Sequence, residues 1–360
     1  MPISAIDAIS PAFAHTKQQL FQPFRADQWA KLALVGLLAG ELTTGSCGNF
    51  NPNLHPAKRA NPLGAATLPA IDPVLLAVLI ALLLVIGFAF FLLLFYLHSV
   101  MRFILFDSVL GKHCDIRQQW NRRQGAAIKY LAWQLGFAVV TFVGLVFLIG
   151  VPAIFALAAG WLTKPKEHIT TLVLCGMALV LVVMAFTLVC AIVQVFTRDF
   201  VVPQMALEDL SAFEAWRRLL PMLRAEKGPY FGYLLMKVVM AIGVGIVLGI
   251  IATIVILLAL IPVGGFGAIA VLTGKAVGLS WNVYTITFVV VVGSVILMVF
   301  LYLIAIVAVP AMVFFPAYSI YFLASRYPRL AMALQPASPI PPPSQPVVGP
   351  PIPPLPEASG

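Results

Sequence analysis

The chain has 360 residues, of which 61% are apolar and only 10% are charged, and its formal net charge is +9. Ordinary soluble domains are about 45–50% apolar and about 25% charged, so this composition excludes a typical soluble enzyme, a disordered protein and a charge-rich nucleic-acid-binding protein. Several apolar runs are longer than a soluble core helix, and none shows the alternating polarity of a transmembrane strand. The composition therefore predicts an all-α, polytopic integral membrane protein.

Residues 1–28 form an amphipathic lead of mixed polarity, and the first apolar run follows at 29–44. That run extends only about 24 Å as a helix, which is less than a hydrocarbon core of about 30 Å. It either spans the membrane with Glu41 at a polar end or enters it part-way, and we expect a span. The segment 45–72 is rich in Gly, Asn and Pro and reads as a loop outside the membrane.

The helical transmembrane domain is expected to cover residues 29–325 with about six spans. These are 29–44, 73–97, 128–150, 170–196, 230–261 and 284–309.

Prolines and glycines mark expected interruptions in the later apolar runs. Pro152 predicts a kinked continuation after the span that ends at 150, and VGGFG at 263–267 predicts a flexible loop. Pro310 and Pro316 are expected to break the last run.

Residues 326–360 are expected to form a Pro-rich, disordered cytoplasmic tail, because eleven of the last 25 residues are proline. The tail could present a docking segment to a protein partner. A plain disordered tail is the interpretation that we prefer.

The basic residues predict an orientation. With six spans, sixteen Lys and Arg residues fall on the side of the two termini and the loops 98–129 and 197–228, and five fall on the other side. Because cytoplasmic loops carry the excess of Lys and Arg, we expect both termini in the cytoplasm and the protein in a bacterial inner membrane. If residues 29–44 did not span, the N-terminus would lie outside.

The two large basic loops share an order of residues that predicts an internal repeat. The matched pairs are Arg102 and Arg198, Asp115 and Ser211, Gln118 and Glu214, Trp120 and Trp216, and Arg122 and Arg218. In each loop an N-capping residue is followed three positions later by Gln or Glu, which is the capping-box pattern. We therefore expect a duplicated two-helix unit that contains an interfacial amphipathic helix.

The segment 211–228 is the clearest interfacial helix, since Phe213, Trp216 and Leu220 share one face and basic residues flank them. A helix packed between the spans is the alternative. We expect anionic lipid head groups to contact four arginines, which are Arg122, Arg123, Arg217 and Arg218.

The sequence contains no motif that predicts chemistry, so we expect no catalytic, cofactor-binding or metal-binding residue. No two histidines have a metal-ligand spacing, and HExxH, GxSxG and phosphate-loop motifs are absent. Of the acidic residues, only Glu41 and Asp107 lie in apolar surroundings. Asp107 follows Arg102 by five residues, which predicts a structural polar pair, and Lys237 could extend from its span to the interface.

Residues 201–236 run VVPQMALEDLSAFEAWRRLLPMLRAEKGPYFGYLLM, and residues 17–40 run KQQLFQPFRADQWAKLALVGLLAG. The first stretch resembles the membrane-embedded domain of some bacterial glycerophosphoryl diester phosphodiesterases, and the second is similar to its uncharacterised stand-alone relatives. The resemblance implies the same membrane architecture over residues 10–325. The enzymes of that family also need an early His and a Glu-x-Asp metal pair. No Glu here is followed two residues later by Asp, so the resemblance implies the membrane module without its catalytic domain.

These observations predict a non-enzymatic envelope accessory or scaffold with membrane lipids, and a further protein, as partners, and without nucleic acid. One alternative is a transporter or permease component, which a cavity lined by Gln134, Gln194 or Asp107 would favour. A second alternative is a membrane-bound lipid-modifying enzyme. It would need polar groups that converge near one membrane face, and the sequence shows no such set.

Overall fold

The computed structural model describes residues 3–41, 73–161, 168–276 and 283–334, and the regular structure in these ranges is helical. Five of the described helices are long and apolar enough to cross a membrane. They are α4 (Pro73–Leu110), α5 (Ile116–Ala158), α6 (Ile169–Phe196), α9 (Lys227–Ala276) and α10 (Val283–Ala324). The predicted class, an all-α polytopic membrane protein, is confirmed.

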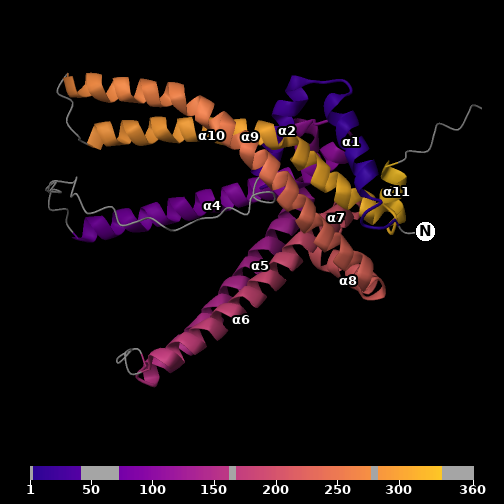
Figure 1. The fold of residues 1–360 in the computed structure, drawn as a ribbon, viewed down its shortest axis with the longest axis horizontal. Coiled ribbons are helices and arrows are strands. Elements are labelled where there is room, and N and C mark those ends of the chain that lie inside the picture. The colour runs from indigo at the N-terminus through magenta and orange to yellow at the C-terminus, as the bar shows by residue number, and fades with distance from the viewer. Residues whose placement is uncertain (1–2, 42–72, 162–167, 277–282, 335–360) are drawn as a thin grey trace, which may run out of the picture.

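Figure 1 shows that one end of every long helix lies in a compact bundle and that the rest of each helix projects from it on the same side. We call the bundle the hub. It contains the long-helix segments 98–110, 116–134, 227–240 and 302–324 together with the short helices. The short helices are α1 (Ile9–Phe21), α2 (Ala26–Leu38), the π-helical turn η1 (Thr197–Val201), α7 (Val202–Glu208), α8 (Ala212–Ala225) and α11 (Pro328–Leu334).

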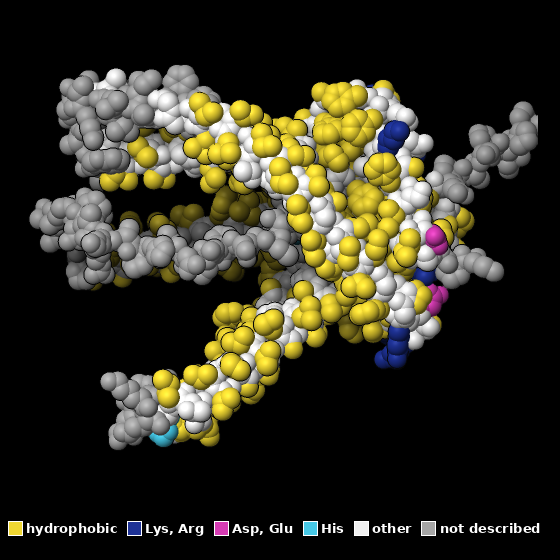
Figure 2. Space-filling view, viewed as in Figure 1, with side chains coloured by type: hydrophobic (Ala, Val, Ile, Leu, Met, Phe, Trp, Pro, Cys, Tyr) yellow, Lys and Arg dark blue, Asp and Glu magenta, His cyan; other side chains and the backbone are white. Residues whose placement is uncertain are grey.

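We call the remaining apolar parts of the five long helices the arms. Large apolar side chains on the arms are exposed, for example those of Leu83, Val140 and Phe288. In Figure 2 hydrophobic side chains cover the described parts of the arms, whereas Lys, Arg, Asp and Glu side chains appear on the hub. A continuous apolar surface of this size marks contact with lipid, and the helices satisfy their own backbone hydrogen bonds there.

The core of the hub is aromatic. Tyr233 of α9 stacks on Tyr318 of α10 with a ring-centroid distance of 5.0 Å, and it lies 4.7 Å from Phe322 and 5.0 Å from Phe200 of η1. All four rings are fully buried. Offset and tilted ring pairs of this kind stabilise a core beyond their area burial, so they hold η1, α9 and α10 together.

The N-terminal lead is part of the hub. Helix α1 packs along α10, and α2 packs on both α10 and α4. His15 and Gln19 of α1 form hydrogen bonds with the carbonyl oxygens of Val109 and Ser108 at the end of α4, at 2.8 and 2.9 Å.

The expected first span, 29–44, differs from the structure. Residues 29–38 belong to α2, which has 13 residues, about 20 Å at 1.5 Å per residue. It ends at a turn in which Gly40 has a φ of 71°, and it lies against α4 and α10 in the hub. Residues 42–44, and the path from Glu41 to Pro73, lie outside the described residues.

The interruptions expected at 263–267, Pro310 and Pro316 are corrected, whereas α5 continues past Pro152 as expected. Residues 263–267 continue α9, Pro152 lies inside α5, and Pro310 and Pro316 lie inside α10. Pro and Gly are tolerated in membrane helices because surrounding groups satisfy the freed backbone atoms. Part of the expected disordered tail is helical, since Pro328–Leu334 form α11. Residues 335–360 lie outside the described residues.

The expected helix caps are present in both basic segments. The Asp115 side chain accepts a hydrogen bond from the Gln118 amide, and Ser211 and Glu214 form a complete capping box. These caps start α5 and α8 at the predicted positions. Residue Leu219 of α8 faces the hub core, while Phe213 is 65% exposed, as an interfacial helix requires.

Candidate functional site

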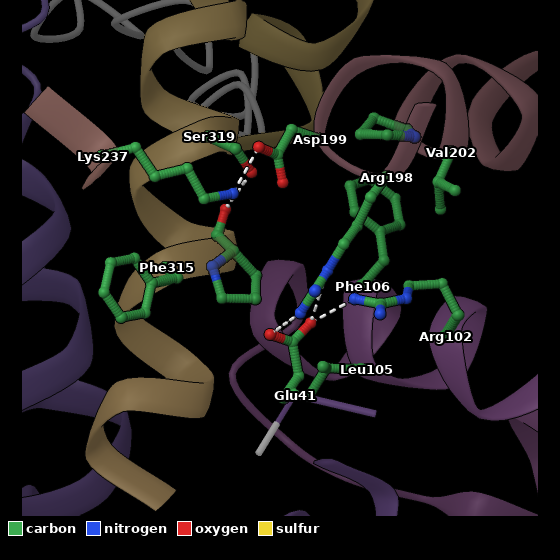
Figure 3. A pocket seen from close by; sticks show the side chains of 12 residues that line it. Glu41, Arg102, Leu105, Phe106, Arg198, Asp199, Val202, Lys237, Phe315 and Ser319 are labelled. Carbon is green, nitrogen blue, oxygen red and sulfur yellow. Dashed lines mark hydrogen bonds and ion pairs between the residues drawn. The ribbon is translucent and has the colours of Figure 1, made fainter. Parts of the chain in front are cut away.

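The candidate site is a cluster of five charged side chains inside the hub, where the arms begin. Its members are Glu41 after α2, Arg102 on α4, Arg198 and Asp199 on η1, and Lys237 on α9 (Figure 3). They line a cavity of about 20 Å³ together with Phe315, Pro316 and Ser319 of α10. Each charged side chain is at least four-fifths buried.

Local structure directs Glu41 into this cluster. The amide of Glu41 donates to the Gly36 carbonyl at 2.9 Å, and that of Gly40 donates to Leu37 at 3.1 Å. This is the Schellman pattern that ends a helix with a left-handed residue. A Cβ atom on Gly40 would also approach the His98 ring to 2.9 Å, so glycine is required at the turn that points Glu41 at α4.

Glu41 is held between two arginines. Arg102 and Arg198 each form an ion pair with its carboxylate, and the Arg198 Nε donates a further hydrogen bond at 3.1 Å. Arg102 also donates from Nη2 to the Ala39 carbonyl at 2.7 Å. A single carboxylate therefore ties the end of α2 to α4 and η1.

Asp199 forms the second half of the cluster. It pairs with Lys237, and it accepts a hydrogen bond from the Tyr233 hydroxyl at 3.0 Å. Arg198 and Asp199 are consecutive residues, yet they bind different partners across the π-helical turn. Single π-helical turns are rare and frequent at functional sites, and this one distributes two adjacent charges over α2 and α9.

The five charges do not cancel. Three cations face two carboxylates, which leaves an excess of one positive charge within the cluster. A buried charge is costly unless a partner compensates it. The arrangement therefore favours an anion or an electron-rich oxygen at the cavity.

The predicted pair between Arg102 and Asp107 is wrong. Asp107 instead receives hydrogen bonds from Arg123, Nε to Oδ2 at 2.6 Å and Nη2 to Oδ1 at 2.7 Å. Residues three or four apart face each other on a helix, whereas five residues separate Arg102 and Asp107, so their side chains point in different directions.

Of the four arginines expected to contact lipid, three are exposed and one is not. Arg122, Arg217 and Arg218 lie on the surface, and Arg218 pairs with Glu208. Arg123 is buried, because it is bound by Asp107 and by the Ala206 carbonyl. Arg123 is therefore a structural residue, which corrects the prediction.

Sequence reasoning missed the cluster as a whole. Glu41 and Lys237 were each recognised as isolated charges in apolar surroundings, and an ionisable residue in such a position is a functional-site candidate. The hub brings five charged groups together around one cavity, a convergence that the sequence does not show. The proposed repeat was the available signal, because its equivalent arginines, Arg102 and Arg198, meet at the same carboxylate.

A second feature lies on the hub surface. An open groove of about 360 Å³ runs between the end of α6, α8 and the start of α9. Its lining is apolar, for example Ile192, Phe196 and Phe231, and two exposed cations, Arg224 and Lys227, also line it. This groove places cations beside a surface suited to acyl chains.

The chain matches a protein family described as "Family of unknown function (DUF7544)" over residues 3–333. No curated protein and no solved structure matches it. The family match covers the hub and all five arms. The resemblance to the membrane domain of glycerophosphoryl diester phosphodiesterases stays an expectation.

Proposed function

Since the chain belongs to this family of unknown function, we propose that the protein is a non-enzymatic scaffold of a bacterial inner membrane, and that its hub rests on anionic lipid at the cytoplasmic face. The observation that carries the proposal is the apolar groove between α6, α8 and α9, which Arg224 and Lys227 also line.

The charges and apolar residues of this groove are ordered along the helices. Arg224 and Lys227 lie at the hub, and the groove continues towards Leu234 on α9 and Ile192 on α6. A lipid that binds here places its head group at the cations and its chains along the arms. Anionic head groups attract basic residues near the membrane surface.

Helix α8 extends the same surface. Phe213 and Leu220 are exposed on it, and Arg217 lies between them in the sequence. Apolar and basic side chains presented together are typical of a helix that lies in the membrane interface.

The buried charges support a scaffold over the two alternatives. In the cluster both carboxylates are engaged by cations, which leaves neither as a ready base for lipid chemistry. Of the residues named for a transporter, Gln134 accepts from Ser99 at 3.1 Å, Asp107 is bound by Arg123, and Gln194 is exposed. The first two therefore connect neighbouring helices.

The test replaces Arg217, Arg224 and Lys227 together by Gln. The protein is reconstituted into nanodiscs that contain mixtures of zwitterionic and anionic lipid, and the lipid that surrounds it is quantified by mass spectrometry. We expect the enrichment of anionic lipid to fall by roughly tenfold or more, because each basic residue near the surface attracts anionic lipid independently.

The matched control keeps the charges and changes the side chains, with Arg217→Lys, Arg224→Lys and Lys227→Arg. It should retain the enrichment, since the attraction is electrostatic. Equal enrichment in the Gln variant and the wild type would exclude this surface as the lipid contact.

A further inference from the structure

A second groove opens between α9 and α10, away from the α8 surface. It has a volume of about 130 Å³. Small and aliphatic side chains form its walls, namely Gly245, Leu248, Gly249 and Ala252 on α9 and Ile304, Val307, Ala308, Ala311 and Met312 on α10. These walls are apolar, and they lie where α9 leaves the hub and α10 enters it.

The groove ends at the charged cluster. Glu41 and Phe315 line both the groove and the cavity of about 20 Å³ that holds Arg102, Arg198 and Lys237. On α9 the sequence order is Lys237, then Gly245, then Ala252, so the polar end faces the hub and the apolar end faces the arms. The groove and the cavity adjoin, so together they have one charged end and one apolar end, as an amphiphilic lipid does.

Two observations at the polar end point to an anionic ligand. Three cations and two carboxylates leave one positive charge uncompensated among the described side chains of the cluster. In addition, Arg102 is only 6% exposed, and its Nε atom lacks a hydrogen-bond partner among the described residues. Glu41 does not favour a cationic ligand, because two arginines already neutralise it.

We propose that this composite site binds one anionic phospholipid, with an acyl chain in the α9–α10 groove and a head-group oxygen in the cavity at Arg102 and Arg198. A cavity of about 20 Å³ has room for about one water-sized group, which is one oxygen of the head group. The apolar groove selects a lipid over a free anion.

The groove is tested with a matched pair of substitutions on α9. At both Gly249 and Gly243 an added Cβ atom would meet nothing within 4 Å, but only Gly249 lines the groove. Gly249→Leu should fill the groove and Gly243→Leu should leave it open. Native mass spectrometry of the full chain, purified from membranes in mild detergent, measures the anionic phospholipid retained. We expect about one per chain in the wild type and in Gly243→Leu, and at least roughly tenfold less in Gly249→Leu.

The role of the excess positive charge is tested with one variant that should lower lipid retention and one that should raise it. Arg198→Gln removes the excess charge while Arg102 still holds Glu41, so lipid retention should fall by roughly tenfold. Glu41→Gln raises the excess charge by one and should increase retention of anionic lipid, which loss of folding would not do.

The proposal is overturned if Gly249→Leu and Gly243→Leu retain equal amounts of lipid, if Glu41→Gln lowers retention as Arg198→Gln does, or if the retained species is inorganic phosphate or zwitterionic lipid. The α8 surface is intact in all of these variants. Failure at the groove is therefore distinguishable from failure of the proposed peripheral contact.

Discussion

His15 is a buried histidine whose hydrogen bonds fit its neutral form. Its Nε2 donates to the Val109 carbonyl at 2.8 Å, and its Nδ1 lies 3.2 Å from the Tyr321 hydroxyl. Burial lowers the pKa of His15 below its ordinary value of 6.5, and the nearby positive charge of Lys112 lowers it further. In the folded protein the ring is therefore neutral at a pH where an unfolded chain would protonate it.

The sign of the pH dependence follows from this lowered pKa. The unfolded state binds the proton first, so the stabilisation is present above about pH 6.5 and is lost as the pH falls towards the folded pKa. We expect the thermal stability of the full chain in detergent to fall between about pH 7.5 and about pH 5.5. For His15→Gln, which cannot titrate, the fall should be smaller than in the wild type. If the thermal stability of the wild type and of His15→Gln falls equally with pH, His15 is not the source of the pH dependence.

The individual pairings show which residue contacts a sequence can predict. The caps at Asp115 and Ser211 were predictable because each bond joins residues three apart. The partners of Glu41 lie 61 and 157 residues away. Helical periodicity describes only neighbours within a turn or two, so it could mark Glu41 as an unusual charge and could not name its partners.

At the scale of elements, Gly36 determines how closely α2 approaches α10. A Cβ atom on Gly36 would overlap the Met312 Sδ and approach the Met312 Cγ to 3.1 Å, and Met312 is buried. Gly36→Ala should therefore force α2 and α10 apart. We expect it to lower the free energy of unfolding by about 1–3 kcal/mol, as overpacking does elsewhere, measured by thermal or denaturant unfolding in detergent.

Gly87→Ala is the matched control for this substitution. Gly87 is also inside a helix, but an added Cβ atom there meets nothing within 4 Å. Since alanine favours a helix over glycine by about 1 kcal/mol, Gly87→Ala should be neutral or stabilising. If both variants change stability in the same direction, close α2–α10 packing is not the cause.

The apolar runs in the sequence predicted where most helices lie. The local propensities of proline and glycine did not predict where these helices end. Residues 170–196 were expected as a span, and α6 covers 169–196. For the 29–44 run, hydropathy does not distinguish a short span from a helix packed in a hub, and residues 29–38 form part of the 13-residue α2. Pro310 and Pro316 were treated as breaks, but in α10 they lie within the helix, where packing and the membrane environment outweigh local propensity.

At the scale of the whole molecule, both ends of the described chain lie in the hub. Helices α1 and α11 belong to it, although the described residues contain five membrane helices. The packing of α1 on α10 therefore makes the side of the membrane on which the N-terminus lies a test of the fold.

This arrangement predicts an outcome for cysteine labelling of intact cells. In a background without the native cysteines, single cysteines at Ser4, Arg122 and Arg217 report on the hub, and one at His168 reports on the start of α6 at the far end of its arm (Figure 1). We expect a membrane-impermeant maleimide to label His168→Cys in whole cells. It should label the three hub positions only after the membrane is opened, because basic residues of membrane proteins concentrate on the cytoplasmic side. Labelling of all three hub positions from outside would invert the orientation while preserving the hub, whereas labelling of Ser4→Cys alone would separate α1 from the hub and contradict the fold.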